Sequence, residues 1–357
     1  MQDLLRFFLA LSVILFHYKH FAIQSWSRNQ IPDDYTPPYQ EALSIFYTHG
    51  YHAVAVFFFL SGYMLALRIS DQTVPRFSYR NFLVQRLARI YPAHALTLIS
   101  MGLLAVMVQQ YSLQPFMTYN DNFLNFVASL FLLNGIGIMR DTSFNLPSWS
   151  LSVEMVCYLL FGAVCVLSFA KKANLWFLGV VIGIGINEVS TNPNVSNVGS
   201  GMVFFFSGAI TGVRFIPWRS WMHSNAQGAT ITLLTLFALS FTMSLHASLG
   251  VQKLIWICIS LPALVIAITI MDERLIGGGK RPFIWFGLMS FSIYIWHFPV
   301  QAILHYLFSS HKIDGIAPYN TLLLFWFYLA ASVLVGHISL STIEKWGGAA
   351  IKCLKTR

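Results

Sequence analysis

Long runs of hydrophobic residues, separated by short polar segments, follow one another along the whole chain. A helix needs about 20 mostly apolar residues to cross a bilayer, and ten runs approach that length. These runs lie at 4–23, 45–67, 90–109, 149–169, 173–186, 198–215, 229–245, 254–271, 283–308 and 320–343. The pattern predicts an all-α, polytopic membrane helix bundle with ten transmembrane helices.

One further run, at 123–139, is shorter and is interrupted by Asn125, Asn134 and Gly135. Lys and Arg concentrate in the short cytoplasmic loops of membrane proteins. If the N-terminus is inside and 123–139 does not cross, most basic residues fall on that side. If 123–139 did cross, Lys171 and Arg214 would change sides. We therefore expect 123–139 to be re-entrant or interfacial, and both termini to be cytoplasmic.

The composition indicates a membrane domain, because 56% of the residues are hydrophobic and only 10% are charged. Apolar runs cover the sequence, so we expect residues 1–357 to form a single integral-membrane domain that contacts lipid. The net charge of +9 comes mainly from residues between these runs and forms no dense basic stretch, which argues against a nucleic-acid partner. The spacing of the four cysteines is not typical of a metal site or a disulfide framework.

Three ionisable residues are predicted to lie at one depth in the membrane. At 1.5 Å per residue, His17 lies about 20 Å and His297 about 21 Å from the inner edge of a core roughly 30 Å thick. Glu154 lies about 7–8 Å below the outer surface. Each alone could be a buried structural group. Together they favour function, because a carboxylate near an imidazole is how proteins build a general base.

The first run also contains Arg6, eleven residues before His17. Eleven steps of about 100° return to nearly the same helix face, about 16 Å away. Arg6 is thus either an anchor at the inner interface or a ligand contact.

Two further positions could contact a ligand. Arg86 and Arg89 are three residues apart and share a helix face, where guanidinium groups would suit a phosphorylated ligand. The alternative is that they only follow the positive-inside rule. Ser61 and Gly62 form a small-residue site where a neighbouring helix or a ligand could approach closely.

Five short motifs occur in order along the chain. They are Arg6 and His17 separated by ten residues, FFFLSGY with Ser61, FLVQRLARIYP with Arg86 and Arg89, LPSWSLSVEMVCYL with Trp149, Ser150 and Glu154, and FGLMSFSIYIWHFPV with Tyr294 and His297. Together they resemble membrane-bound acyltransferase family 3, the bacterial O-acyltransferases that modify polysaccharides and related glycans. The chain departs from that pattern at Ala53 and Ala55, where many members have Gly and an acid, and we expect no soluble hydrolase-like domain.

The resemblance implies an enzyme of the bacterial inner membrane. It would take an acyl group, most often acetyl, from cytoplasmic acyl-CoA and pass it to a sugar hydroxyl. The acceptor would be an exopolysaccharide, an O-antigen or a related glycan, free or lipid-linked. Transfer could be direct or could pass through an acylated side chain.

The resemblance also implies residue roles. His17 would be the general base and Glu154 would orient it or hold its charge. The donor would be bound by Arg86, Arg89, Arg6 and Ser61. The acceptor would be bound by Trp149, Ser150, Tyr294 and His297.

A rival interpretation is a proton-coupled transporter or a flippase for lipid-linked sugars, in which the same His and Glu residues would relay protons. Broken helices in two matching halves would favour that class, and the sequence has no such duplication. A purely structural scaffold would leave the layer of ionisable groups unexplained.

Overall fold

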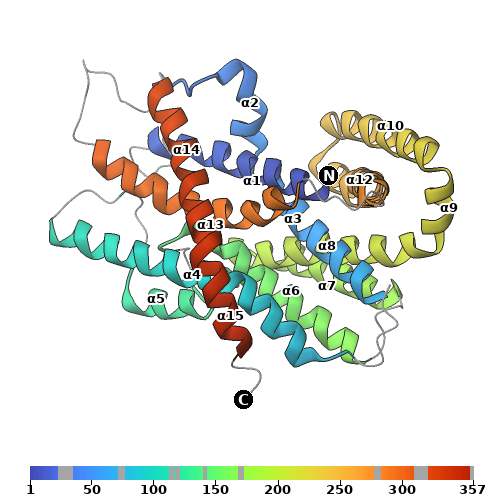
Figure 1. Cartoon of the computed structure of the whole chain (residues 1–357), viewed down its shortest axis with the longest axis horizontal. Helices are drawn as coiled ribbons and strands as arrows, with labels where there is room; N and C mark the ends of the chain where they lie inside the picture. The colour runs from blue at the N-terminus through green and yellow to red at the C-terminus, as the bar shows by residue number, and fades with distance from the viewer. Residues whose placement is uncertain are drawn as a thin grey trace. The chain divides into compact units, whose positions relative to one another are not determined.

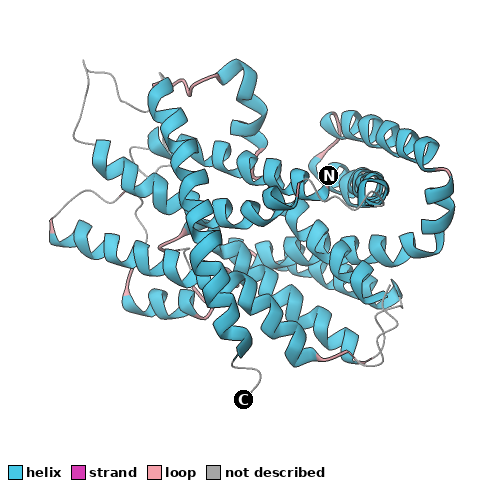
Figure 2. Ribbon diagram, viewed as in Figure 1, coloured by secondary structure: helices cyan, strands magenta, loops and turns pink. Residues whose placement is uncertain are grey.

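The computed structural model describes residues 1–22, 35–70, 77–111, 116, 121–139, 143–167, 173–276, 283–308 and 321–353. Within these ranges the chain forms helices joined by loops and no strand (Figure 2). Nine segments of the described chain are helical, long and apolar enough to cross a membrane. They are Gln2–Ala22, His52–Ile69, Tyr79–Gln110, Leu146–Val166, Pro193–Ser224, Ala226–Ser244, Gly250–Arg274, Ile284–Phe308 and Leu322–Cys353. The predicted all-α membrane bundle is confirmed.

The helices group into two compact units, each assembled from separate stretches of the chain. Unit 1 consists of Met1–Arg6, Val54–Arg80 and Val156–Gly287, and unit 2 of Phe7–Ala53, Asn81–Met155 and Leu288–Arg357. Neither unit is a continuous part of the sequence. The single domain over 1–357 stays a prediction.

Unit 1 contains most of α3 and the helices from the middle of α6 to α12. Their bounds are α3 (His52–Ser70), α6 (Trp149–Val166), α7 (Ala173–Val189), α8 (Pro193–Phe215), α9 (Arg219–Ser224), α10 (Ala226–Leu245), α11 (Leu249–Ile255) and α12 (Leu261–Ile276), with a π-helical turn at Trp256–Ser260. Helices α3 and α8 cross at Gly62 and Gly208. A Cβ added at Gly62 would lie 1.9 Å from the carbonyl oxygen of Phe205, so only glycine fits there.

Unit 2 contains most of α1, α4 and α13, all of α2, α5, α14 and α15, and the start of α6. Their bounds are α1 (Gln2–Tyr18), α2 (Gln40–His49), α4 (Tyr79–Gln110), α5 (Phe123–Leu130), α13 (Ile284–Phe308), α14 (Leu322–Ser339) and α15 (Lys345–Cys353). Helix α14 continues through a π-helical turn, Leu340–Glu344, into α15, so that the two follow one line in Figure 1. A core of buried residues that includes Tyr18, Ile293 and Tyr328 joins α1, α13 and α14.

Two prolines lie inside helices of unit 2, and each leaves one backbone carbonyl without its helical hydrogen bond. Pro299 of α13 has no N–H for the carbonyl of Ile295, and the side-chain Nδ2 of Asn145 donates to that oxygen at 3.0 Å. Pro92 of α4 likewise leaves the carbonyl of Ala88 without its helical hydrogen bond, and Gly348 of α15 packs against that carbonyl. The sequence before α6 thus stabilises α13, and α15 lies close to α4.

The predicted span at 45–67 is wrong at its start, because α2 ends at His49 and α3 begins at His52. Gly50 explains the break. A Cβ added there would lie 2.3 Å from the carbonyl oxygen of Ser12 on α1, so the chain turns where it meets that helix.

The predicted start at Ile90 is also wrong, because α4 begins at Tyr79 and runs for 32 residues. Its first turns contain Arg80, Arg86 and Arg89, which the search for apolar runs excluded. The predicted span at 173–186 corresponds to α7, a shorter apolar helix of 17 residues, and its crossing stays a prediction. Lys171 and the predicted run ends at 23, 169 and 320 lie outside the described residues.

The run at 123–139 is not one continuous helix. Helix α5 has eight residues, begins at a side-chain cap from Asn122 and gives way to turns from Phe131 onward. Eight residues rise only about 12 Å, too little to cross the membrane. The turns pack against the start of α6, since a Cβ at Gly135 would lie 2.3 Å from the Trp149 carbonyl oxygen. This agrees with the prediction that the segment does not span.

Candidate active site

The candidate active site lies in unit 2, where the end of α1 meets the middle of α13. His17 is in the last turn of α1 and is only 9% exposed. The next residue, Tyr18, is fully buried in the core that joins α1 to α13 and α14. The packing of Tyr18 therefore fastens the end of α1, where His17 lies, to α13 and α14.

His17 contacts His297 directly. Nδ1 of His17 and Nε2 of His297 are 3.2 Å apart, and His297 is fully buried. The two rings meet edge to face, with centroids 5.0 Å apart. Depth counting along the sequence predicted the same layer for both residues, and the structure brings them into hydrogen-bonding distance.

The other ring nitrogen of His297 determines which atom carries the proton. Nδ1 of His297 is 2.6 Å from the backbone carbonyl oxygen of Tyr294. A carbonyl oxygen only accepts, so Nδ1 of His297 is the donor, and Nε2 of neutral His297 is an acceptor. Nδ1 of His17 must then donate to His297. This leaves a lone pair on Nε2 of His17, which is what a general base requires.

Gln301 supports the same arrangement and was not singled out in the sequence. It lies one helical turn after His297, is fully buried, and its Nε2 donates to the carbonyl oxygen of His17 at 2.8 Å. That carbonyl is at the end of α1, where a helix leaves its last carbonyls without partners. The signal available in the sequence was the spacing of four residues between His297 and Gln301, which places both on one face of α13.

Ser150 and Tyr294 join the start of α6 to α13. Their hydroxyl oxygens are 2.7 Å apart, and each is 3.0 Å from the carbonyl oxygen of Pro147. Two motifs separated by about 140 residues in sequence therefore meet at one buried network. Because the Tyr294 backbone carbonyl also accepts from His297, this network positions the histidine pair.

Glu154 and Trp149 are half-buried on α6 in the same unit. The Glu154 carboxylate interacts electrostatically with the Tyr294 hydroxyl. The predicted pairing of Glu154 with His17 stays a prediction.

The remaining predicted donor residues are distributed over both units. Arg6 and Ser61 belong to unit 1, where the Ser61 hydroxyl lies 3.1 Å from that of Tyr158. Arg86 and Arg89 belong to unit 2. The Arg86 guanidinium lies 5.8 Å from the centre of the Phe82 ring, whereas Arg89 is exposed and lines a pocket.

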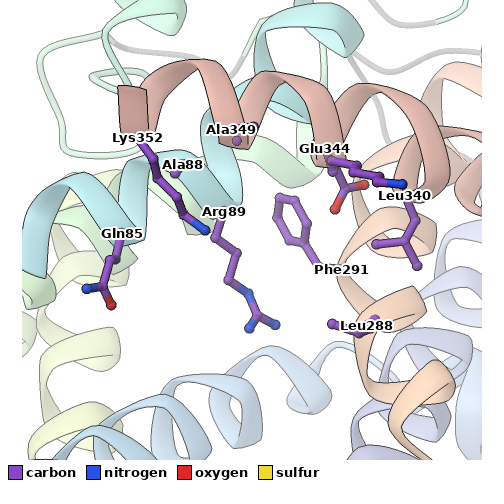
Figure 3. Close-up of a pocket in the computed structure, with 11 residues that line it drawn as sticks. Gln85, Ala88, Arg89, Leu288, Phe291, Leu340, Glu344, Ala349 and Lys352 are labelled. Carbon is purple, nitrogen blue, oxygen red and sulfur yellow. The ribbon is translucent and has the colours of Figure 1, made fainter. Parts of the chain in front are cut away.

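This pocket, which we call the Arg89 pocket, has a volume of about 530 Å³ and lies between α4, α13 and the joined helices α14 and α15 (Figure 3). In Figure 3, Arg89 extends into it from α4, and Lys352 extends towards it from α15. The pocket is lined by Gln85, Ala88, Arg89, Leu288, Phe291, Leu340, Glu344, Lys345, Gly348, Ala349 and Lys352.

The sequence model of one family, described as acyltransferase domain, matches residues 3–339. The chain belongs to this acyltransferase family. The match includes all of the candidate residues on α1, α3, α4, α6 and α13, and the predicted resemblance is confirmed.

Among curated proteins, the chain is similar to acyltransferase MdmB of Streptomyces mycarofaciens. The two are 34% identical over 117 residues, which is 32% of this chain and 28% of that protein. The matched region therefore spans well under half of the relative's length. No solved structure matches this acyltransferase family member.

Proposed function

We propose that the protein is an integral-membrane O-acyltransferase that moves an acyl group, in the first instance acetyl, from acyl-CoA to a sugar hydroxyl. The observation that carries the proposal is the contact between His17 and His297, whose hydrogen bonds leave a lone pair on Nε2 of His17. Membership of the acyltransferase family supports the reaction class. The multi-pass helices support a location in the membrane, which we propose is the bacterial inner membrane.

In the proposed reaction, the acceptor hydroxyl gives its proton to Nε2 of His17 while its oxygen attacks the thioester carbonyl carbon. The tetrahedral intermediate collapses, the C–S bond breaks, and the leaving thiolate takes the proton back from His17. The imidazolium formed in between keeps its Nδ1–H bond to neutral His297. Glu154 is proposed to compensate the positive charge.

The other predicted residues are proposed to bind either the donor or the acceptor. Arg86 and Arg89 of unit 2 are proposed to face the cytoplasm and to bind donor phosphates. Arg6 and Ser61 of unit 1 are each proposed to contact the donor. Trp149 is proposed to contact the glycan, free or lipid-linked.

On the acceptor side, the hydroxyls of Ser150 and Tyr294 lie within hydrogen-bonding distance of each other and of the Pro147 carbonyl oxygen. We therefore assign these two residues to positioning the acceptor side of the site.

Inverted membrane vesicles with acetyl-labelled acetyl-CoA test the reaction against the transport alternative. The proposed function predicts that label appears in the glycan fraction and that free CoA thiol is released in equal amount. It also predicts no proton uptake coupled to sugar movement. Proton-coupled sugar movement without label transfer would instead show a transporter or flippase and would exclude the enzyme.

A further inference from the structure

The Arg89 pocket carries more positive than negative charge. Arg89, Lys345 and Lys352 line it, and Glu344 is the one acidic residue among its lining residues. Lys345 and Lys352 lie beyond residue 339, where the match to the acyltransferase family ends. Lys352 was not among the residues that the sequence motifs pointed to.

Hydrogen bonds to serines hold Glu344 at the edge of the pocket. Oε1 of Glu344 accepts from the Ser292 hydroxyl at 2.6 Å and from the Ser339 hydroxyl at 3.0 Å. The carboxylate also attracts Arg89 electrostatically. Within the part of the chain that the structure describes, neither Lys345 nor Lys352 forms an ion pair with it.

Two features of the backbone bring the three cations to one place. A Cβ added at Gly347 would lie 2.7 Å from Pro92, and one at Gly348 would lie 2.8 Å from the Ala88 carbonyl oxygen. Because these glycines have no side chain, α15 packs closely on α4 directly beside Arg89. The π-helical turn Leu340–Glu344 shifts the register just before the lysines.

The walls of the pocket complement a ligand that is only partly charged. Leu288, Phe291 and Leu340 supply apolar and aromatic surface, and in Figure 3 they lie across the pocket from Arg89 and Lys352. A volume of about 530 Å³ is within the range of small-molecule sites, roughly 300–1,000 Å³. An aromatic face, aliphatic side chains and several cations together suit a phosphorylated nucleotide.

We propose that the Arg89 pocket binds the phosphorylated nucleotide end of the acyl donor, with Lys345 and Lys352 contacting phosphate beside Arg89. The assignment of the donor rests on the proposed function. The same phosphate chemistry is offered by anionic lipid headgroups, so the experiment includes both sources.

The test uses the full chain in nanodiscs, with 3′-phosphoadenosine 5′-diphosphate as the probe, because this is the donor's nucleotide without its acyl arm. Calorimetry compares the native chain, the double variant Lys345→Gln/Lys352→Gln, and the control Arg80→Gln, which removes a cation of the same helix as Arg89 outside the pocket lining. The double variant is expected to bind at least about tenfold more weakly, and the control to bind like the native chain. Equal affinity in all three would overturn the proposal.

Two lipid compositions separate the two phosphate sources. Nucleotide affinity is expected to be the same in discs of zwitterionic lipid and in discs with added anionic lipid. If anionic lipid displaces the nucleotide from the native chain, and the double variant removes this competition, the pocket is a headgroup site and the donor assignment is wrong.

Transfer assays on the same samples separate this proposal from the proposed function. The double variant is expected to raise the KM for acetyl-CoA about tenfold without changing kcat, because the lost contacts would bind the donor equally in the ground state and in the transition state. If the double variant transfers acetyl with the native KM and binds the nucleotide as tightly as the native chain, the pocket proposal alone is overturned. If the double variant binds the nucleotide more weakly but the native chain transfers no acetyl group, the pocket proposal is supported and the proposed acyltransferase function is overturned.

Discussion

At the scale of single residues, one hydrogen bond from His297 to a backbone carbonyl determines which nitrogen of His17 carries the proton. The Tyr294 carbonyl makes Nδ1 of His297 a donor, and this in turn makes Nδ1 of His17 a donor. His297 is then a positioning residue in this account, whereas the sequence motifs had suggested that it binds the acceptor. The burial of both rings excludes competing water from the pair.

Replacing His297 separates positioning from space filling. His297→Phe keeps a ring but removes both nitrogens, so His17 can carry its proton on Nε2, and kcat is expected to fall about 100-fold with an unchanged KM for the donor. His297→Gln offers an amide that can accept from His17 and donate to Tyr294, so it is expected to retain most of kcat. Steady-state kinetics on folded samples of both variants measure this, and equal losses in the two would contradict the positioning role.

At the scale of helices, glycines and prolines determine which elements come close. Gly62 and Gly208 allow α3 and α8 to cross, and Gly347 and Gly348 do the same for α4 and α15. Pro299 interrupts the hydrogen bonds of α13 next to His297, and Asn145 restores the lost bond from another segment. Helix contacts in a membrane depend on such close packing, because lipid provides no hydrophobic driving force between helices.

The α3–α8 crossing can be tested with a matched pair of glycine variants in unit 1. Gly62→Ala places a methyl group 1.9 Å from the Phe205 carbonyl oxygen, whereas Gly185 of α7 has no heavy atom within 4 Å of an added Cβ. Gly62→Ala is expected to destabilise the fold by about 1–3 kcal/mol. Gly185→Ala is expected to be neutral or stabilising by up to about 1 kcal/mol. Thermal unfolding in detergent measures both, and a Gly62→Ala midpoint at or above that of the native chain would contradict the crossing.

At the scale of the whole molecule, apolar runs alone predicted most helices, because the bilayer sets their length. They did not predict the break at Gly50, which results from contact with Ser12 on another helix. They also placed the start of α4 too late, because a helix can extend past the apolar core into a region where arginines are favourable.

The candidate site was predictable in part. Depth counting grouped His17 with His297 because both are titratable, and titratable residues stand out in an apolar sequence. Gln301 and Asn145 could not be found in this way, since uncharged amides occur at many positions and their role depends on which carbonyl they reach. Lys345 and Lys352 could not be assigned to a site from the sequence, because their position beside Arg89 depends on the packing of α15 on α4.

The central claim is that His17 is the base of acyl transfer, and a single-turnover measurement tests it most directly. Acetyl transfer from labelled acetyl-CoA is followed for the native chain, for His17→Asn and for the control His94→Asn, which alters another buried histidine, bonded to the Ser129 carbonyl. His17→Asn is expected to bind the donor normally and to transfer acetyl about 10²–10⁴ times more slowly, with His94→Asn close to the native rate. Transfer by His17→Asn at the native rate would contradict the account.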